Sequence, residues 1–276
     1  MAPPAPLARA LWRAIEPIHA VTYFSSESSE AYAAAGLKGF WMGYFGGRGA
    51  PMGEVGAAVV EATFFNFHPD MVRRVIPDAW SYASAVELLD VRAAAAAATL
   101  RRLAPSVDDA ARELLPLLSR AIGAADGPGR PLFAANQDVA MPSDPVAALW
   151  QATTTLREHR GDGHVSVLTS EGLDGCETHV LFATVNDVSG EVYQRSRGWS
   201  DDDWSAAGER LRVRGVGRGL HERIEARTDE LAIAPYAVLS NDELARVLDV
   251  AGRVSERITT SGLYPYPNPI GLPAPD

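Results

Sequence analysis

The chain has 276 residues, of which 47% are hydrophobic and 22% charged, and its formal net charge is −10. This composition is that of a globular protein long enough for two ordinary domains. No apolar run reaches the ~18 residues needed to span a bilayer, and no apolar segment of a secretory signal follows the proline-rich start. The single cysteine, Cys176, excludes an internal disulfide and a multi-cysteine metal site. We therefore expect a cytoplasmic protein with no membrane partner.

The acidic charge also bears on possible partners. Nucleic-acid-binding proteins usually carry a basic surface, because neutralising phosphates supplies much of their affinity. A net charge of −10 provides no such surface over the chain as a whole. Local basic patches remain an alternative at Arg73 and Arg74 and at Arg210, Arg212 and Arg214. We therefore expect weak, non-specific DNA binding and no dedicated nucleic-acid partner.

The spacing of apolar residues predicts helices over most of the first half. The expected helices are residues 7–20 with an interruption at Pro17, a segment capped at Ser25–Ser29 and ended by Gly36, an aromatic helix from Gly39 to Phe45, and residues 82–103 and 107–122. The glycine-rich run Gly46–Gly53 is expected to be a loop. It lacks the lysine and hydroxyl residue that end a phosphate-binding loop, so a structural turn is the better interpretation.

The stretch Ala62 to Asp70 concentrates three phenylalanines and a histidine ahead of a proline. Pro69 fits the first position of a helix and keeps the preceding residue out of the α conformation, so we predict a break at His68 and a helix from Pro69 to Ile76. The helix macrodipole disfavours a charged imidazole at that position. A neutral His68 among aromatic rings suits a ligand contact, a metal ligand or a general base, and it also suits a buried structural histidine.

Residues 126–144 are rich in glycine and proline, and we place a domain linker there. The N-terminal domain then covers residues 1–125 and the C-terminal domain residues 145–276. The second domain is expected to contain helices over 145–158, 164–171, 174–187, 201–211 and 221–232, turns at 159–164 and 215–219, and a proline-rich tail draped over the surface.

The second half repeats short segments of the first. Ala10-Leu11-Trp12 corresponds to Ala148-Leu149-Trp150, and Gly36-Leu37-Lys38-Gly39 corresponds to Gly172-Leu173-Asp174-Gly175, at nearly equal separations. Repeats at a constant offset indicate duplicated units. We therefore predict two copies of one helical domain, with Trp12 and Trp150 in equivalent places.

Several segments together carry a family resemblance. They are Tyr23-Phe24 with Glu27, Gly36 to Trp41, Arg48 with Ala50-Pro51, Ala62 to Pro69, Ile76 to Trp80, Gly161 to His164, Ile224 to Asp229 and Asn268 to Gly271. With these segments the chain resembles the actinobacterial SalK-type helix-turn-helix family, which is related in fold to the MarR regulators. The resemblance implies a mainly α fold of two tandem, pseudo-duplicated winged-helix-like domains, and it implies little about activity.

One feature departs from a winged helix that binds DNA. Such a domain carries a β-hairpin wing after its recognition helix. Only Pro77–Trp80 in the first half and Gly215–Gly219 in the second occupy that place, and neither leaves room for two strands of usual length. We therefore expect the wings to be reduced or absent.

The candidate site is a mostly apolar cleft between the two halves, since ligands commonly bind between domains. His19 and Tyr23 lie one turn apart on one helix face, and with His68 they are the candidate catalytic residues. The candidate substrate-binding residues are Arg48, Phe64, Phe67, Trp41 and Glu27. Arg48 would pair with a carboxylate or phosphate, and Glu27 or Glu61 would accept a proton.

Two functions are compatible with these features. The first is a protein of specialised metabolism that binds or transforms a small apolar metabolite, and a biosynthetic enzyme of undefined reaction is favoured. The second is a MarR-like transcriptional regulator with an effector in the same cleft. Acidic charge and missing wings favour the first, and analogy of fold favours the second, although fold does not fix function. Haem or a single metal held by His68 is the cofactor considered, and a homodimer is an open alternative.

Overall fold

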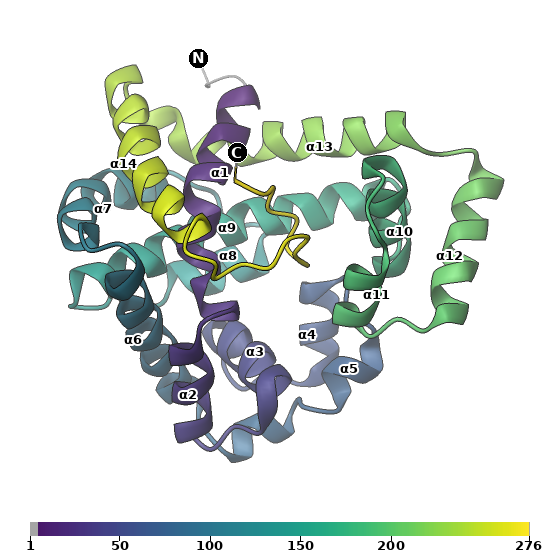
Figure 1. Cartoon of the computed structure of the whole chain (residues 1–276), viewed down its shortest axis with the longest axis horizontal. Coiled ribbons are helices and arrows are strands. Elements are labelled where there is room, and N and C mark those ends of the chain that lie inside the picture. The colour runs from purple at the N-terminus through teal and green to yellow at the C-terminus, as the bar shows by residue number, and fades with distance from the viewer. Residues whose placement is uncertain (1–4, 276) are drawn as a thin grey trace.

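The computed structural model describes residues 5–275, shown in Figure 1 as an assembly of helices. These residues form 14 α-helices and no β-strand, which confirms the expected mainly α fold. The α-helices are α1 (Ala5–Ala20), α2 (Ser26–Ala34), α3 (Gly39–Gly49), α4 (Ala57–Phe64), α5 (Pro69–Arg73), α6 (Ala85–Leu103), α7 (Val107–Gly123), α8 (Pro131–Gln137), α9 (Pro145–Ser170), α10 (Gly175–Asn186), α11 (Glu191–Arg197), α12 (Asp201–Arg214), α13 (Arg218–Ala232) and α14 (Asn241–Thr259). The 3₁₀ helices are η1 (Val21–Tyr23), η2 (Ala50–Met52), η3 (Asp78–Ser81) and η4 (Ala234–Val238). Within residues 5–275, no helix is long and apolar enough to cross a membrane.

Helices from both halves of the chain build the central core. The first helix, α1, packs along the last, α14, and α7 packs along α9. One hydrophobic cluster joins these four helices, and Leu11, Leu114, Leu149 and Val247 are fully buried in it. The apolar faces that predicted these helices therefore face one another across the two halves of the chain.

Two smaller hydrophobic clusters adjoin the central core, and we call them lobes. Lobe 1 contains α3, α4, α5 and η3, with Phe45, Phe64 and Val72 buried inside it. Lobe 2 contains the end of α9 with α10, α12 and the start of α13, and it buries Leu168 and Leu220. Figure 1 shows α10 to α12 at one side of the molecule. Each half of the chain thus contributes one lobe beside a shared core.

The two lobes contact each other just ahead of α5 and α12. The backbone N–H of His68 donates to the carbonyl of Arg197 at 2.8 Å, and the indole N–H of Trp199 donates to the carbonyl of Asn66 at 3.1 Å. The approach is close, since a Cβ on Gly175 would lie 2.5 Å from a carbonyl oxygen of the turn after α4. Hydrogen bonds and packing therefore fix the position of one lobe on the other.

Two predicted glycine turns are wrong. The segment 159–164 lies inside α9, and the first part of the segment 46–53 completes α3. At Gly47 glycine is needed for space, because a Cβ would overlap the Tyr32 side chain. A Cβ on Gly163 would lie 2.8 Å from a terminal nitrogen of Arg130, which is the end of a flexible side chain. These glycines permit close packing of a regular helix, and the backbone freedom of glycine is not used.

The predicted linker and tail are also more ordered than expected. The segment 126–144 contains α8, whose Leu132 and Phe133 are buried. The proline-rich tail crosses the middle of the molecule in Figure 1 and buries Tyr264 and Leu272. The Tyr264 hydroxyl donates to the carbonyl of Pro17 at 2.6 Å. The tail is therefore anchored in the central core, and it does not merely drape over the surface.

The two Gly-Leu-x-Gly segments form the same turn. Gly36 and Gly172 have φ angles of 89° and 66°. The N–H groups of Leu37 and Leu173 each donate to the carbonyl five residues earlier, which closes the C-terminus of the preceding helix. Both leucines are buried. This local agreement is what a duplication predicts, and the correspondence of the complete halves stays a prediction.

Because α1 and α14 share one core, we expect the protein to unfold in a single cooperative transition. Leu11→Ala empties a fully buried position in this core and is expected to lower the free energy of unfolding by about 2–5 kcal/mol. Urea denaturation followed by circular dichroism measures the change. Val86→Ala, at a position that is 72% exposed, is the control. Two separate transitions, of which only one shifts, would contradict a shared core.

Candidate functional site

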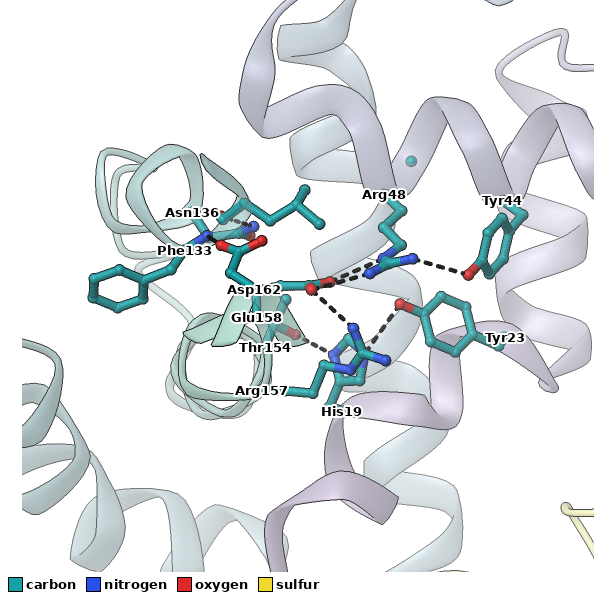
Figure 2. Close-up of polar contacts among 12 residues, drawn as sticks. His19, Tyr23, Tyr44, Arg48, Phe133, Asn136, Thr154, Arg157, Glu158 and Asp162 are labelled. Atoms are coloured by element: carbon teal, nitrogen blue, oxygen red, sulfur yellow. Dashed lines mark hydrogen bonds and ion pairs between the residues drawn. The ribbon is translucent and has the colours of Figure 1, made fainter. Parts of the chain in front are cut away.

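A buried polar cluster lies where α1, α3 and α9 meet (Figure 2). His19, near the end of α1, is 1% exposed. Its Nδ1 lies 2.8 Å from the hydroxyl of Thr154, and its Nε2 lies 3.0 Å from the hydroxyl of Tyr23. Its ring stacks on Trp150, whose indole N–H donates to the His19 carbonyl at 2.9 Å. His19 and Tyr23 are therefore paired across one turn, as their spacing indicated.

Burial determines the protonation of this pair. Burial lowers the pKa of His19 well below its usual value of 6.5, and the positive charge of Arg157 lowers it further. Burial also raises the pKa of Tyr23 far above its usual value of 10. Both side chains are therefore neutral at physiological pH. Since neither pKa lies near the working pH, the pair is poorly suited to proton transfer.

Arg48 and Glu158 form the charged part of the cluster. Two nitrogens of Arg48 donate to the two oxygens of Glu158 at 2.9 and 3.1 Å, and a third donates to the hydroxyl of Tyr44 at 3.2 Å. Arg157 donates to Glu158 at 2.8 Å and lies 3.4 Å from Glu16. Burial raises the pKa of Glu158, but Arg157 and Arg48 together hold it below its usual range. Glu158 is therefore an ionised carboxylate. Its ion pair neutralises Arg48, which was expected to bind a carboxylate or phosphate of the substrate.

One face of α9 supplies three polar side chains at four-residue spacing: Thr154, Glu158 and Asp162 (Figure 2). Asp162 accepts the backbone N–H of Phe133 at 2.8 Å, and burial raises its pKa to about 6. This face was not predicted, because residues 159–164 were interpreted as a turn. Its signal is the four-residue spacing of Thr154, Glu158 and Asp162, which becomes one face when the helix continues through Gly161.

Two cavities border the cluster, and Tyr23 and Tyr44 line both. The first, which we call the aromatic cavity, measures about 270 Å³ and lies between η1, α2 and α3. Its lining consists of Thr22, Tyr23, Ser29, Tyr32, Ala33, Leu37, Gly39, Phe40, Gly43 and Tyr44. The second, which we call the interlobe cavity, measures about 240 Å³ and is lined from α1, α9, α10, α11 and the tail. The rings of Tyr23 and Tyr44, 5.0 Å apart, thus border both spaces.

The buried hydroxyl of Thr22, which lines the aromatic cavity, has no hydrogen bond of standard geometry, although it interacts with the hydroxyl of Tyr32. Thr22 is 8% exposed, and it also borders a space of about 10 Å³ beside Arg92. A space of that size holds about one water molecule. Arg92 itself donates to the acceptors Gly47 O, Asn136 Oδ1 and Gln151 Oε1. The aromatic cavity therefore combines apolar rings with several hydroxyls, of which that of Thr22 is fully buried.

Three aromatic residues predicted for the site serve mainly as its support. Phe64 lies under the guanidinium of Arg48, 4.3 Å from the ring centre. Phe67 and Trp41 pack against each other, with ring centres 6.0 Å apart, in the core of lobe 1. The concentration of phenylalanines that attracted attention in the sequence is thus the hydrophobic cluster of this lobe.

Glu27 and His68 are not part of the cluster. Glu27 forms an ion pair with Arg102, which lowers the pKa of its carboxyl to about 2, so it is a poor proton acceptor. The Nδ1 of His68 accepts the N–H of Asp70 at 3.2 Å, and its ring lies 5.1 Å from that of Trp199. His68 therefore caps α5 at the lobe contact, which corrects the expectation that it shares a cavity with His19 and Tyr23. Residues 5–275 contain no group of three or more His, Cys, Asp or Glu side chains that could hold a metal.

Glu158→Gln leaves two buried arginines without their shared carboxylate. We expect it to lower the free energy of unfolding by about 3–5 kcal/mol. Because the folded pKa of Glu158 lies below its unfolded value of 4.5, its stabilisation is complete above that pH and declines as the pH falls below it. The variant should therefore lose less stability than the parent protein between about pH 5 and about pH 3.

Urea denaturation at several pH values measures both effects of this substitution. Glu209→Gln is the control, since Glu209 forms an exposed pair with Arg212. Parallel pH profiles for the parent protein and Glu158→Gln would contradict the assignment of Glu158 as the buried carboxylate.

Comparison with known proteins adds one finding to this geometry. Residues 8–265 match the model of a helix-turn-helix family. No curated protein and no solved structure matches the chain. Since the match covers nearly the whole chain, the protein belongs to this helix-turn-helix family.

Proposed function

We propose that this protein binds a small, mostly apolar molecule in the aromatic cavity, and that its lobes form the walls of binding sites rather than a DNA-reading surface. The aromatic cavity carries the proposal. It is a mostly apolar space of about 270 Å³ whose one fully buried hydroxyl without a hydrogen bond of standard geometry is that of Thr22. Ligand sites commonly have this character, with apolar walls and a few polar groups that fix orientation.

The lining also limits the chemistry of the ligand. None of the side chains that line the aromatic cavity is charged, so an ionised group would lose its hydration without gaining a partner. One hydroxyl, carbonyl or amine is sufficient to satisfy Thr22. We therefore propose an uncharged aromatic or aliphatic ligand with one hydrogen-bonding group, and no reaction is assigned to it.

The lobe contact argues against paired reading of DNA. Dimeric helix-turn-helix proteins place two recognition helices in successive major grooves, about 34 Å apart. The candidate recognition helices here are α5 and α12. The segments ahead of them are joined by the hydrogen bonds of His68 and Trp199. In this arrangement the two helices start too close together to span one turn of DNA.

The arginines of these two helices have carboxylate partners. Arg73 pairs with Glu61 at 2.7 Å, and Arg212 pairs with Glu209 at 2.6 Å. Arg210 donates to carboxylates of α10 and its cap. The helix α12 also begins with three aspartates, which repel phosphates. The local patches considered from the sequence are therefore largely neutralised.

A transcriptional regulator with an effector in the aromatic cavity is the second candidate. Membership of a helix-turn-helix family favours it, since proteins with this motif commonly bind DNA. For that function the lobes would have to separate at the contact of His68 and Trp199. The SalK-type resemblance supports a role in specialised metabolism for both candidates. It also favours a winged-helix, MarR-like fold for each lobe.

Binding in the aromatic cavity is testable with 2-naphthol, a neutral fluorescent ring with one hydroxyl. We expect saturable binding by fluorescence titration. Ala33→Phe, at an exposed position of α2 that lines the cavity, should weaken binding by about tenfold or more because the new ring occupies the space. Ala34→Phe, the next exposed position and outside the lining, is the matched control. Equal affinities for the two variants, or no saturable binding, would refute the proposed site.

We expect DNA binding to be weak and insensitive to sequence, with a Kd no tighter than about 10⁻⁶ M at physiological salt. Fluorescence anisotropy with duplexes of random sequence and of the region upstream of the gene measures this. The affinity should fall steeply when salt is raised, because only phosphate contacts contribute. Nanomolar, sequence-selective binding would establish the regulator instead.

A further inference from the structure

Arg197, the last residue of α11, is a buried cation without a carboxylate partner among residues 5–275. It is 8% exposed. One terminal nitrogen donates to the carbonyl of Pro269 at 2.7 Å, another donates to the hydroxyl of Ser196 at 3.4 Å, and Nε has no partner. The guanidinium lies 4.5 Å from the ring centre of Phe67. Burying a charge without a counter-charge is costly. An anion bound beside Arg197 would therefore be stabilised by its charge.

Three partly buried arginines have carboxylate partners, whereas the fully buried Arg92 has none in the described part of the chain and donates to a backbone carbonyl and two side-chain amide oxygens. Arg48 and Arg157 share the carboxylate of Glu158, and Arg160 donates to a carboxylate at 2.7 Å. Two cations, Arg48 and Arg157, act on Arg197, and Tyr44 and Tyr193 have the opposite effect. Burial and these two positive charges lower the pKa of Arg197. The surroundings of Arg197 thus favour an additional negative charge.

A second unpartnered polar atom lies in the same region. His179 of α10 is 7% exposed, and its Nε2 has no hydrogen-bond partner. Its ring stacks on Tyr193, with ring centres 5.7 Å apart. Burial and the charge of Arg197 lower the pKa of His179 well below 6.5. A neutral imidazole here offers one hydrogen bond to a bound molecule.

Both residues line the interlobe cavity of about 240 Å³. Its remaining walls include Trp12 of α1, Tyr44 of α3 and Phe182 of α10, so rings from both halves of the chain surround it. The tail forms one side with residues 269–271 and accepts a hydrogen bond from Arg197 there. The cavity therefore combines an unmatched cation, an unpartnered imidazole and an aromatic wall. Its other charged side chains are paired with one another, and its second imidazole, that of His164, contacts the hydroxyl of Thr228.

We propose that the interlobe cavity binds a small organic carboxylate, whose oxygens pair with the guanidinium of Arg197 and whose apolar body lies against Trp12, Tyr44 and Tyr193. A guanidinium suits this partner because its planar donors match the two oxygens of a carboxylate. The site is separate from the aromatic cavity and shares only Tyr23 and Tyr44 with it. The proposal therefore does not depend on the ligand of the aromatic cavity.

The test titrates the full chain with benzoate and with benzyl alcohol, which keeps the ring but lacks the charge. Calorimetry should show saturable benzoate binding, with benzyl alcohol about tenfold weaker or more. Arg197→Gln removes the cation and is expected to weaken benzoate by about tenfold or more, since a charge-assisted pair is lost. Arg195→Gln, two residues earlier and 79% exposed, changes the net charge equally and should leave the affinity unchanged.

Stability and spectroscopy separate this role from a structural one. Because Arg197 has no counter-charge to lose, the ligand-free Arg197→Gln variant should melt at the same temperature as the parent protein or higher. If that variant does not fold, Arg197→Lys keeps the charge, loses the planar pair of donors and should bind benzoate more weakly. The ring resonances of His179, assigned with His179→Gln, should shift when benzoate is added.

Three results would overturn the proposal. The first is the absence of binding by benzoate, phenylacetate and hexanoate alike. The second is benzoate binding that is equally tight in the parent protein and the folded Arg197 variants. The third is inorganic phosphate binding as tightly as benzoate, since the rings would then contribute nothing. The 2-naphthol titration with Ala33→Phe is independent of these results, so failure of one site is distinguishable from failure of the other.

Discussion

One carboxylate, that of Glu158, holds the candidate site together. It projects from α9 and neutralises Arg48 of α3, which also donates to Tyr44 and packs over Phe64. A buried ion pair is weak evidence for net stability, because desolvation offsets much of the attraction. It does determine which groups meet. Here the ion pair of Arg48 and Glu158 holds lobe 1 against α9. It also places Tyr44 beside Tyr23, and the two rings border both cavities.

The periodic helices were predictable, and the use of glycine was not. The helices α6, α7 and α13 begin and end close to their expected bounds, because a buried face repeats its apolar residues every three or four positions. Gly47 and Gly163 were interpreted as turns. A glycine can be required for its backbone freedom or for its small size, and the sequence alone does not reveal which of the two applies. Only the neighbour that occupies the space, such as Tyr32 beside Gly47, distinguishes the two.

The candidate site was predictable only where its members are close in sequence. His19 and Tyr23 were paired because four residues separate them on a helix. The partner of Arg48 is 110 residues away, and no local pattern records that contact. The unmatched charge of Arg197 is visible only after every carboxylate has been placed. The aromatic segment around His68 was conspicuous for a different reason, since it fills the core of a lobe.

The packing of α1 on α14 has a consequence for how the protein is made. The helix α14 is synthesised roughly 220 residues after α1, which takes roughly 10–45 s at the usual rate of translation. During that time Leu11, Ile15 and Ile18 leave the ribosome without the helix that finally covers them. Ordinary domains fold in turn as they emerge. In this chain the central core closes only after α14 has emerged, so it folds later than a core built from neighbouring helices would.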